Sequence, residues 1–372
     1  MTIRYLFIPL AICCLASCGG KNGYEQYICE NCIDTLYLPE KDNFEASEYV
    51  GQIKYIPLQN SDRHILSAVS KMSVSDSMIF VSNMKQGKLC AYKINGDFLY
   101  EIHAVGRSFR EYYEIKSFCV DDKSVHILDN AKRLLISYSK VDGAYQQTRH
   151  LEHVAWDIES YGNEHFIFSY NDNNSSDDIT AVPSSGVWIT DKELKTTGCQ
   201  MMIDTKEDLT GKQNYFTKHS DKVIYHDYKH YGYYIFNPND SIPSFVSVQV
   251  SNPIPLEMLT DYDEVSNGNY QYLTETPFVT DEYVVLAVGT GKYEESAVAS
   301  SKDGVIHFFS ENSSHNYMPF PNAVYDEEFI YYLNDYNFYS TLKNDGFMSL
   351  DAETEELLKR GGAVLLIYDM KL

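Results

Sequence analysis

The densest cluster of polar and aromatic side chains in the sequence lies at residues 225–231, which read Tyr-His-Asp-Tyr-Lys-His-Tyr. Imidazole nitrogens bind metals and polar substrates, so His226 and His230 could hold either one if this segment lined a channel. Tyr225 and Tyr231 would add aromatic surface to the same site. The alternative is a tyrosine-rich pair of strands with a solvated turn. The four residues are therefore candidates for ligand binding.

A second candidate site lies at residues 106–112, which read Gly-Arg-Ser-Phe-Arg-Glu-Tyr. Arg107, Glu111 and Tyr112 could form a polar patch at the mouth of such a channel. Guanidinium groups also pair with carboxylates inside a protein. An internal salt bridge therefore explains the two charges equally well, and both interpretations stay open.

Familiar catalytic and metal-binding spacings are missing from the sequence. We find no nucleophile elbow, phosphate-binding loop, HExxH or EF-hand spacing. His150 and His153 lack further ligands at a recognisable spacing. The acidic residues 261–264 could hold Ca²⁺, but Ser266 stands where an EF-hand loop needs glycine. We predict no catalytic residue, no metal and no cofactor, and favour a protein that is not an enzyme while leaving that question open.

The cysteines favour one local disulfide, formed in an oxidising compartment. The cysteines that follow Cys18 are Cys29, Cys32, Cys90, Cys119 and Cys199. Their number is odd, which argues against a complete disulfide framework. Cys29 and Cys32 have CxxC spacing, for which a local disulfide is the favoured interpretation. Incidental thiols are one alternative. A redox site is another, although the strand-to-helix context that lowers the pKa of such a thiol is missing.

The first residues indicate export. An apolar run follows Arg4 and ends in Leu-Ala-Ser ahead of Cys18, which matches a bacterial lipobox. We predict a signal peptide at residues 1–17 and lipid on Cys18 that makes the membrane a partner. Residues 18–44 would form a tether or extension. Gly19 replaces the Asp that signals inner-membrane retention, which favours the outer membrane. An ordinary signal peptide or a short uncleaved anchor is the alternative.

Composition excludes some partners. The formal net charge is -23, and an acidic surface disfavours nucleic acid and anionic lipid headgroups. The 32 Tyr and 18 Phe favour strands. Some tyrosines could be displayed to bind sugars or peptides, whereas the alternative is that they pack between sheets.

Two segments of the chain repeat each other. Residues 78–98 contain a β-rich run ending at Asn83, a second run, and then Asn-Gly at Gly96. Residues 125–145 repeat this order with Asn130 and Gly143 at the same spacing. Asn-Gly and Asp-Gly suit a tight hairpin turn in which both central residues take positive φ. Each unit is therefore predicted to be a small antiparallel meander.

Weaker copies of the first run extend the series to six units, and together they predict an all-β fold. Six four-stranded antiparallel blades in series make a six-bladed β-propeller, which we place at residues 45–372. A solenoid or a pair of sandwiches is the alternative. The ring would close between residues 49–58 and 363–368. A short helix is predicted at residues 351–360, just before the closing strand, because its acidic start and basic end suit the helix dipole.

With these features, the chain resembles the six-bladed β-propeller lipoproteins of Gram-negative gut bacteria, relatives of the NHL-type propellers. The lipobox, residues 106–112 and the acidic helix before the last strand carry the resemblance. That family often has Gly-Arg-Gly-Pro-Gly-Glu-Tyr where this chain keeps Gly106, Arg107, Glu111 and Tyr112. The resemblance covers residues 45–372 and implies the fold and an envelope location. It implies no activity.

The anchor, the repeats and the tyrosines favour a lipid-anchored binding or scaffolding module outside the cytoplasm. Capture of a glycan or glycopeptide is the context that the resemblance favours, and the ligand is otherwise unknown. One alternative is a propeller hydrolase or lyase with its site in the central channel. Another is a structural subunit of an outer-membrane complex that binds a protein partner.

Overall fold

A computed structural model describes most of the chain beyond its first thirty residues. The described residues are 31–39, 49–59, 66–170, 185–202, 214–226, 231–255, 258, 261–290, 293–300, 304–308 and 318–371. The predicted signal peptide and lipidated Cys18 lie outside them, and so do Cys29 and His230.

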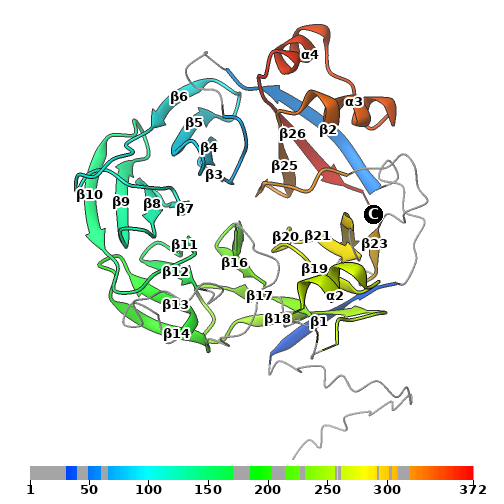
Figure 1. Ribbon diagram of the computed structural model, residues 1–372, viewed down its shortest axis with the longest axis horizontal. Coiled ribbons are helices and arrows are strands. Elements are labelled where there is room, and N and C mark those ends of the chain that lie inside the picture. Colours follow the sequence, from blue (N-terminus) through cyan, green and yellow to red (C-terminus); the bar gives the residue numbers. More distant parts are fainter. Residues whose placement is uncertain are drawn as a thin grey trace, which may run out of the picture.

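The described strands form six sheets that stand around a central axis like blades (Figure 1). Blade 1 consists of β3 (Lys71–Ser75), β4 (Met78–Asn83), β5 (Lys88–Lys93) and β6 (Phe98–Ile102). Blade 2 consists of β7 (Ser117–Val120), β8 (Ser124–Asp129), β9 (Leu134–Ser139) and β10 (Tyr145–His150). Blade 3 consists of β11 (Asp157–Tyr161), β12 (His165–Ser169), β13 (Ser185–Asp191) and β14 (Thr196–Met202).

The second half of the ring repeats this plan with additions. Blade 4 consists of β15 (Phe216–His219), β16 (Lys222–Tyr225), β17 (Gly232–Phe236) and β18 (Ser244–Val250). Blade 5 consists of β20 (Phe278–Val279), β21 (Tyr283–Thr290), β22 (Tyr293–Ser300) and β23 (Ile306–Phe308), with β19 (Gln271–Leu273) beside β20 on β21. Blade 6 consists of β24 (Ala323–Tyr325), β25 (Glu328–Leu333), β26 (Val364–Met370) and β2 (Val50–Pro57). The predicted six-bladed β-propeller is confirmed.

Blade 6 closes the ring with strands from both ends of the chain. β2 pairs antiparallel with β26, with Tyr55 opposite Leu366. This is the closure that the sequence predicts, and it removes two edges that would otherwise be open to pairing.

The N-terminal extension adds a fifth strand to blade 4. β1 (Cys32–Leu38) runs parallel to β18, with Leu36 opposite Val248. The Tyr37 amide also donates to the Gly304 carbonyl of blade 5 at 2.8 Å. The segment therefore joins the outer edges of two blades.

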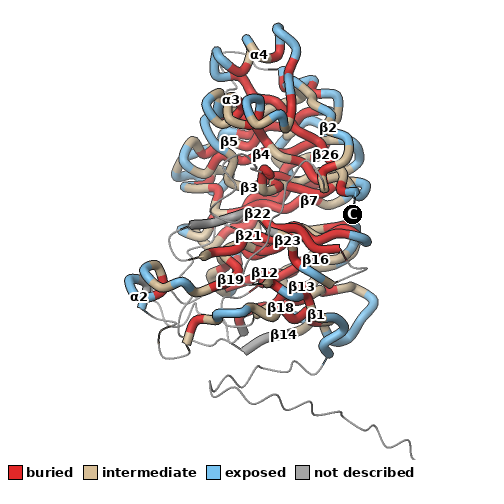
Figure 2. The backbone as a smooth tube through the Cα atoms, turned by 90° about the vertical axis from the view of Figure 1, so that its right-hand side faces the viewer, coloured by how far each residue is buried: buried red, intermediate tan, exposed pale blue. Residues whose placement is uncertain are grey.

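Packing between blades forms the core, which Figure 2 shows as buried strands stacked along the molecule. Side chains alternate between the two faces of a strand. In β8, Val125 and Ile127 pack toward blade 1, while His126 and Leu128 lie on the side of blade 3. Because both faces of a blade are covered, its central strands are buried throughout.

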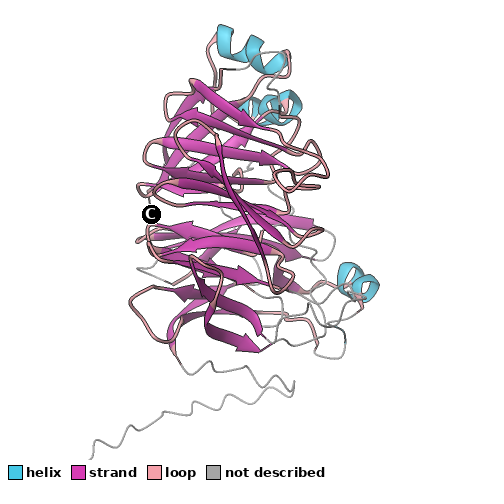
Figure 3. Ribbon diagram, turned by 90° about the vertical axis from the view of Figure 1, so that its left-hand side faces the viewer, coloured by secondary structure: helices cyan, strands magenta, loops and turns pink. Residues whose placement is uncertain are grey.

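The helices lie outside the sheets (cyan in Figure 3). α4 (Ala352–Lys359) confirms the helix predicted at residues 351–360, and the Asp351 carboxylate caps it by accepting from the Thr354 amide. α3 (Tyr336–Asn344) buries Tyr339 against blade 6 and was not predicted. α2 (Tyr262–Asn267) occupies the acidic segment considered for Ca²⁺, where Asp261 serves as its N-cap.

The hairpin turns differ in detail from the prediction. Gly96 has φ of +91°, whereas Asn95 does not take positive φ. The Gly96 amide donates to the Lys93 carbonyl at 2.9 Å, and a Cβ at Gly96 would collide with the Pro57 carbonyl oxygen. The prediction that both central residues take positive φ was therefore wrong, because the loop is one residue longer than a two-residue turn and only glycine adopts the left-handed conformation.

Candidate functional site

The loop at residues 106–112 is held by the fold itself. Arg107 is exposed, and the Glu111 carboxylate accepts from the Ser108 amide at 2.8 Å. That hydrogen bond is the main reason why the pKa of Glu111 lies below its ordinary value. Lys132 donates to the Ser108 and Glu111 carbonyls at 3.2 and 2.8 Å. The loop is thus tied to blade 2 through Lys132.

Tyr112 is buried at the end of this loop. Its hydroxyl lies 2.9 Å from the Gly87 carbonyl oxygen and accepts from the Ala104 amide at 3.1 Å. Burial raises the pKa of Tyr112. The side chain therefore joins blade 1 to the loop.

The second predicted cluster is also built into the fold. Tyr225 is buried and its ring lies beside those of Phe216 and Tyr234. His226 is buried, and its Nδ1 lies 2.6 Å from the Gly232 carbonyl oxygen. The half-buried Tyr231 accepts from the Ile254 amide at 2.7 Å.

The propeller has a cavity on its axis, which is described below. None of the candidates that the structure describes lines this cavity. Arg107, Glu111 and Tyr112 precede blade 2, whereas Tyr225, His226 and Tyr231 lie in blade 4 and its turn. The structure brings the two groups into no common site. Cys32 is exposed at the start of β1, and its disulfide with Cys29 stays a prediction.

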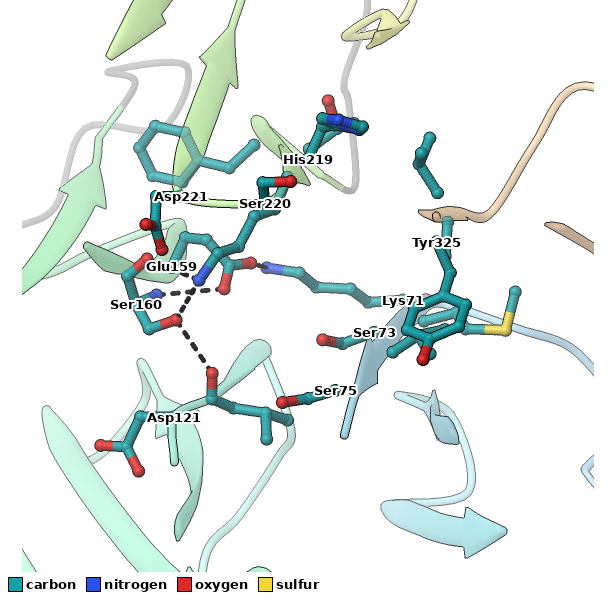
Figure 4. A pocket seen from close by; sticks show the side chains of 18 of the residues that line it. Lys71, Ser73, Ser75, Asp121, Glu159, Ser160, His219, Ser220, Asp221 and Tyr325 are labelled. Carbon is teal, nitrogen blue, oxygen red and sulfur yellow. Dashed lines mark hydrogen bonds and ion pairs between the residues drawn. The ribbon is translucent and has the colours of Figure 1, made fainter. Parts of the chain in front are cut away.

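The axis of the propeller instead holds a polar cavity of about 330 Å³. Its lining comes from the first strand of each blade and from the turns that follow those strands (Figure 4). Serine and threonine hydroxyls contribute part of it: Ser73, Ser75, Ser160, Thr217 and Ser220.

A buried ion cluster lies on the wall of this cavity. The Lys71 ammonium lies 2.8 Å from Asp157 Oδ1 and 3.4 Å from Glu159 Oε2, and all three side chains are buried. It also donates to the Ile158 carbonyl at 2.9 Å. Burial alone would lower the pKa of Lys71, but the two carboxylates outweigh it and the pKa is raised. Lys71 is therefore a cation that compensates buried negative charge.

Asp157 extends this cluster across four blades. The Ser117 hydroxyl of blade 2 donates to Asp157 Oδ1. The amides of Tyr215 and Phe216, at the start of blade 4, donate to Oδ2 at 2.8 and 2.9 Å. Together with Lys71 of blade 1, these bonds join blades 1–4 at the axis.

The mouth of the cavity is acidic. The turns after the first strands of four blades supply its carboxylates: Asp76, Asp121, Asp122, Asp221 and Asp326. Asp76 and Asp221 are exposed, so the cavity opens toward solvent at this end. Carboxylates here can accept hydrogen bonds from a ligand or attract a cation.

A serine–histidine–aspartate arrangement lies between blades 2 and 3. His126 Nδ1 is 2.8 Å from Ser137 Oγ, and its Nε2 is 2.9 Å from Asp121 Oδ2. Lys192 of blade 3 also reaches Asp121 at 2.7 Å. Ser137 has no exposed surface. A nucleophile must be reached by its substrate, and the buried Ser137 is not accessible in this arrangement, which instead joins blade 2 to blade 3 through Lys192.

The charges of this cluster follow from burial and pairing. Burial is the largest influence on His126 and lowers its pKa against the opposing effect of Asp121. Burial would raise the pKa of Asp121, but His126 and Lys192 hold it well below its usual range. Near neutral pH, His126 is therefore neutral and Asp121 ionised.

Among the described residues, one group has donor atoms close enough to hold a metal ion. It consists of His219, Asp281 and Glu327, at the rim of the cavity. Sequence reasoning missed this group and Lys71 alike, because their members come from different blades.

The ring of six blades and its axial cavity define the class: this is a six-bladed β-propeller protein. The chain belongs to the family described as Domain of unknown function (DUF4934), whose sequence pattern matches residues 33–361. No curated protein matches the sequence.

Two solved structures share the fold. An exported protein from Bacteroides fragilis aligns with a TM-score of 0.72 and 15% identity over 91% of this chain and 100% of its own. A member of the duf4221 family from Bacteroides vulgatus aligns with a TM-score of 0.52 and 7% identity over 87% and 97%. At such identities the likeness shows the fold alone. The kinship with gut-bacterial lipoproteins and NHL-type propellers stays a prediction.

Across the described ranges, no helix has both the length and the apolar character needed to cross a membrane.

Proposed function

We propose that this protein is a binding module, anchored to the cell envelope by lipid on Cys18, which takes a polar ligand into the mouth of its axial cavity. The polar cavity of about 330 Å³ supports this proposal most strongly. Ligand pockets span about 300–1,000 Å³, so this one suits a small group such as the end of a longer molecule.

The chemistry of the lining favours a ligand rich in hydroxyl or amino groups. Serine hydroxyls both donate and accept, and the exposed carboxylates of Asp76 and Asp122 accept. Tyr325 adds a ring at the edge of the cavity (Figure 4). A glycan or glycopeptide end matches these groups, and it is the ligand that we propose.

A cavity-filling variant tests the proposal. Ser73 lies in β3 and lines the cavity, whereas Ser108 is exposed in the loop before blade 2. The thermal unfolding of the chain of residues 19–372, and of its S73W and S108W variants, would be measured with a panel of glycans and peptidoglycan fragments. A ligand at about a hundredfold its Kd stabilises a protein by about 2.7 kcal/mol. We expect one glycan class to raise the Tm of the parent chain and of S108W, but not that of S73W.

The outcomes separate the candidate sites. A shift lost in S108W and kept in S73W would move the site to the loop that contains Arg107 and Glu111. A panel without any shift would contradict the binding proposal and favour a structural subunit. For the anchor, C18A should remove the protein from the membrane fraction and abolish labelling with a fatty-acid analogue. Labelling that persists in C18A would overturn that part.

A further inference from the structure

Three possible metal ligands converge at the rim of the cavity from three consecutive blades. His219 is the last residue of β15 in blade 4. Asp281 lies in the turn after β20 of blade 5, and Glu327 lies in the turn after β24 of blade 6. The turn after each first strand faces the same end of the propeller. The ring therefore places these side chains together although they are far apart in the sequence.

The distances are close to those of a coordination shell. One donor atom from each residue lies within 4.8 Å of the other two. His219 Nε2 is 2.9 Å from Glu327 Oε1. Two donors at about 2.1 Å from a tetrahedral zinc ion lie about 3.4 Å apart, so these side chains need only small shifts to surround an ion. The side chains of Asp281 and Glu327 are 67% and 49% exposed. The Asp281 amide donates to Glu327 Oε2 at 2.8 Å, so the two residues already lie side by side.

His219 is prepared to act as a ligand. Its side chain is 94% buried, and burial is the largest cause of a pKa below the ordinary value, despite opposing contributions from Glu327 and Asp281. The buried ring is also held in place, whereas the two carboxylates can close around an ion.

The ammonium of Lys222 already lies beside one of the two carboxylates. Lys222 Nζ lies 3.0 Å from Asp281 Oδ1, with both side chains well exposed. An exposed pair of this kind contributes little to stability. A divalent ion can therefore displace the ammonium from Asp281, and the charge of Lys222 opposes that ion.

We propose that His219, Asp281 and Glu327 form a binding site for a divalent transition metal of the zinc class. One nitrogen and two carboxylate donors match the ligand preference of such ions, whereas Ca²⁺ takes oxygen ligands only. With three protein ligands the ion keeps a position for water or a ligand. His219 lines the cavity, so this position lies beside the mouth. The proposal goes beyond glycan binding and does not rest on it.

Cobalt and zinc titrations test the site directly. Residues 19–372, freed of metal by chelation, would be titrated with Co²⁺ while the d–d absorption is recorded, and then with Zn²⁺ in competition. We expect one saturable Co²⁺ site that Zn²⁺ displaces and that Ca²⁺ at the same concentration leaves unchanged. A chain that binds no Co²⁺ and no Zn²⁺ by equilibrium dialysis would overturn the proposal.

Substitutions then assign the ligands. H219Q, D281N and E327Q should each weaken Zn²⁺ binding by about 100-fold or more, since even loss of an outer partner weakens metal binding about 10–100-fold. D142N is the matched control, because Asp142 is an exposed turn carboxylate of blade 2 outside both the group and the cavity lining. It should bind Zn²⁺ as the parent chain does. Binding that survives all three ligand substitutions would place the metal elsewhere and contradict the assignment.

Lys222 supplies a test in the opposite direction. K222M removes the ammonium that pairs with Asp281, so Zn²⁺ affinity should rise severalfold. Unchanged or weaker affinity would contradict the competition that the geometry implies. Because glycan binding is measured separately with S73W, failure of the metal site and failure of the proposed function are distinguishable.

Discussion

Two histidine–carboxylate clusters lie at the same end of this propeller, and they differ in the burial of their carboxylates. His126 and Asp121 are enclosed between blades 2 and 3, with Lys192 over the carboxylate. His219 lies at the rim, where exposed carboxylates of blades 5 and 6 reach it. Both clusters combine an imidazole with an acidic turn that follows a first strand.

The difference shows that residue type alone does not make a site. In the enclosed cluster, both ring nitrogens of His126 have protein partners, Ser137 and Asp121. Its polar groups stabilise the contact between two blades. At the rim, Asp281 and Glu327 keep contact with solvent, so an incoming ion or ligand can reach them. Enclosed polar groups serve the fold, and the rim is available for binding.

The largest expected loss of stability comes from breaking the buried ion cluster of Lys71, Asp157 and Glu159 at the axis. K71M leaves Asp157 and Glu159 buried without their cation, and removal of one partner of a buried pair costs about 3–5 kcal/mol. We expect the free energy of unfolding, measured in urea at pH 7, to fall by this amount.

Lys140 provides the matched control for Lys71. Its side chain is also buried, but its partner Asp76 is exposed. In K140M the exposed Asp76 carboxylate stays in contact with water, and the cost should be about 1.5–3 kcal/mol, that of hydrogen bonds to a charged group. Equal losses in K71M and K140M would show that burial of the partner does not govern the cost.

Protonation of His126 in the enclosed cluster should have a smaller effect on the free energy of unfolding. The pKa of His126 is lower in the folded chain than the ordinary value of about 6.5 that it has in the unfolded chain. At a pH between these two pKa values, the unfolded chain therefore binds more protons than the folded chain. Stability therefore falls as the pH falls from 7 to 5, by at most about 1.4 kcal/mol per pH unit for one proton. H126Q should show a shallower loss in urea unfolding at pH 7, 6 and 5.

H103Q controls for the loss of any histidine. The side chain of His103 is 44% exposed, so H103Q removes a histidine without opening a buried site. If H126Q and H103Q gave the same slope as the parent chain, the depressed pKa of His126 would play no part in the acid sensitivity.

The sequence predicted the fold well, because its signals are local. The strands show in β-rich runs, the turns in Gly96 and Gly143, and α4 in its charged ends. α3 was missed, since its Tyr and Phe favour strands, whereas Asp335 caps it and Tyr339 anchors it to blade 6. The buried Leu36 and Leu38 at period two could have indicated β1.

The site could not be predicted in the same way, because no spacing encodes it. Lys71 and Asp157 are 86 residues apart, and the ring alone brings them together. The local cluster at residues 225–231 attracted attention because it is dense, yet Tyr225 and His226 are buried in the fold. A usable signal existed in the charged residues of the first strands of blades 1, 3 and 4 and in the aspartate that follows most first strands within two residues.

The smallest expected loss of stability is that of a substitution at the rim, and it tests directly whether the two clusters differ. E327Q removes the ion pair with His219, but the Glu327 side chain is 49% exposed, so without metal it should cost less than about 1 kcal/mol. D121N makes the matching change in the enclosed cluster and should cost about 2–3 kcal/mol, because the lost hydrogen bonds involve charged groups. Urea unfolding of both variants in a chelator checks the pair. A loss above 2 kcal/mol in E327Q would make the rim a structural element. A small loss means that the fold does not need this carboxylate, which leaves it available for a ligand.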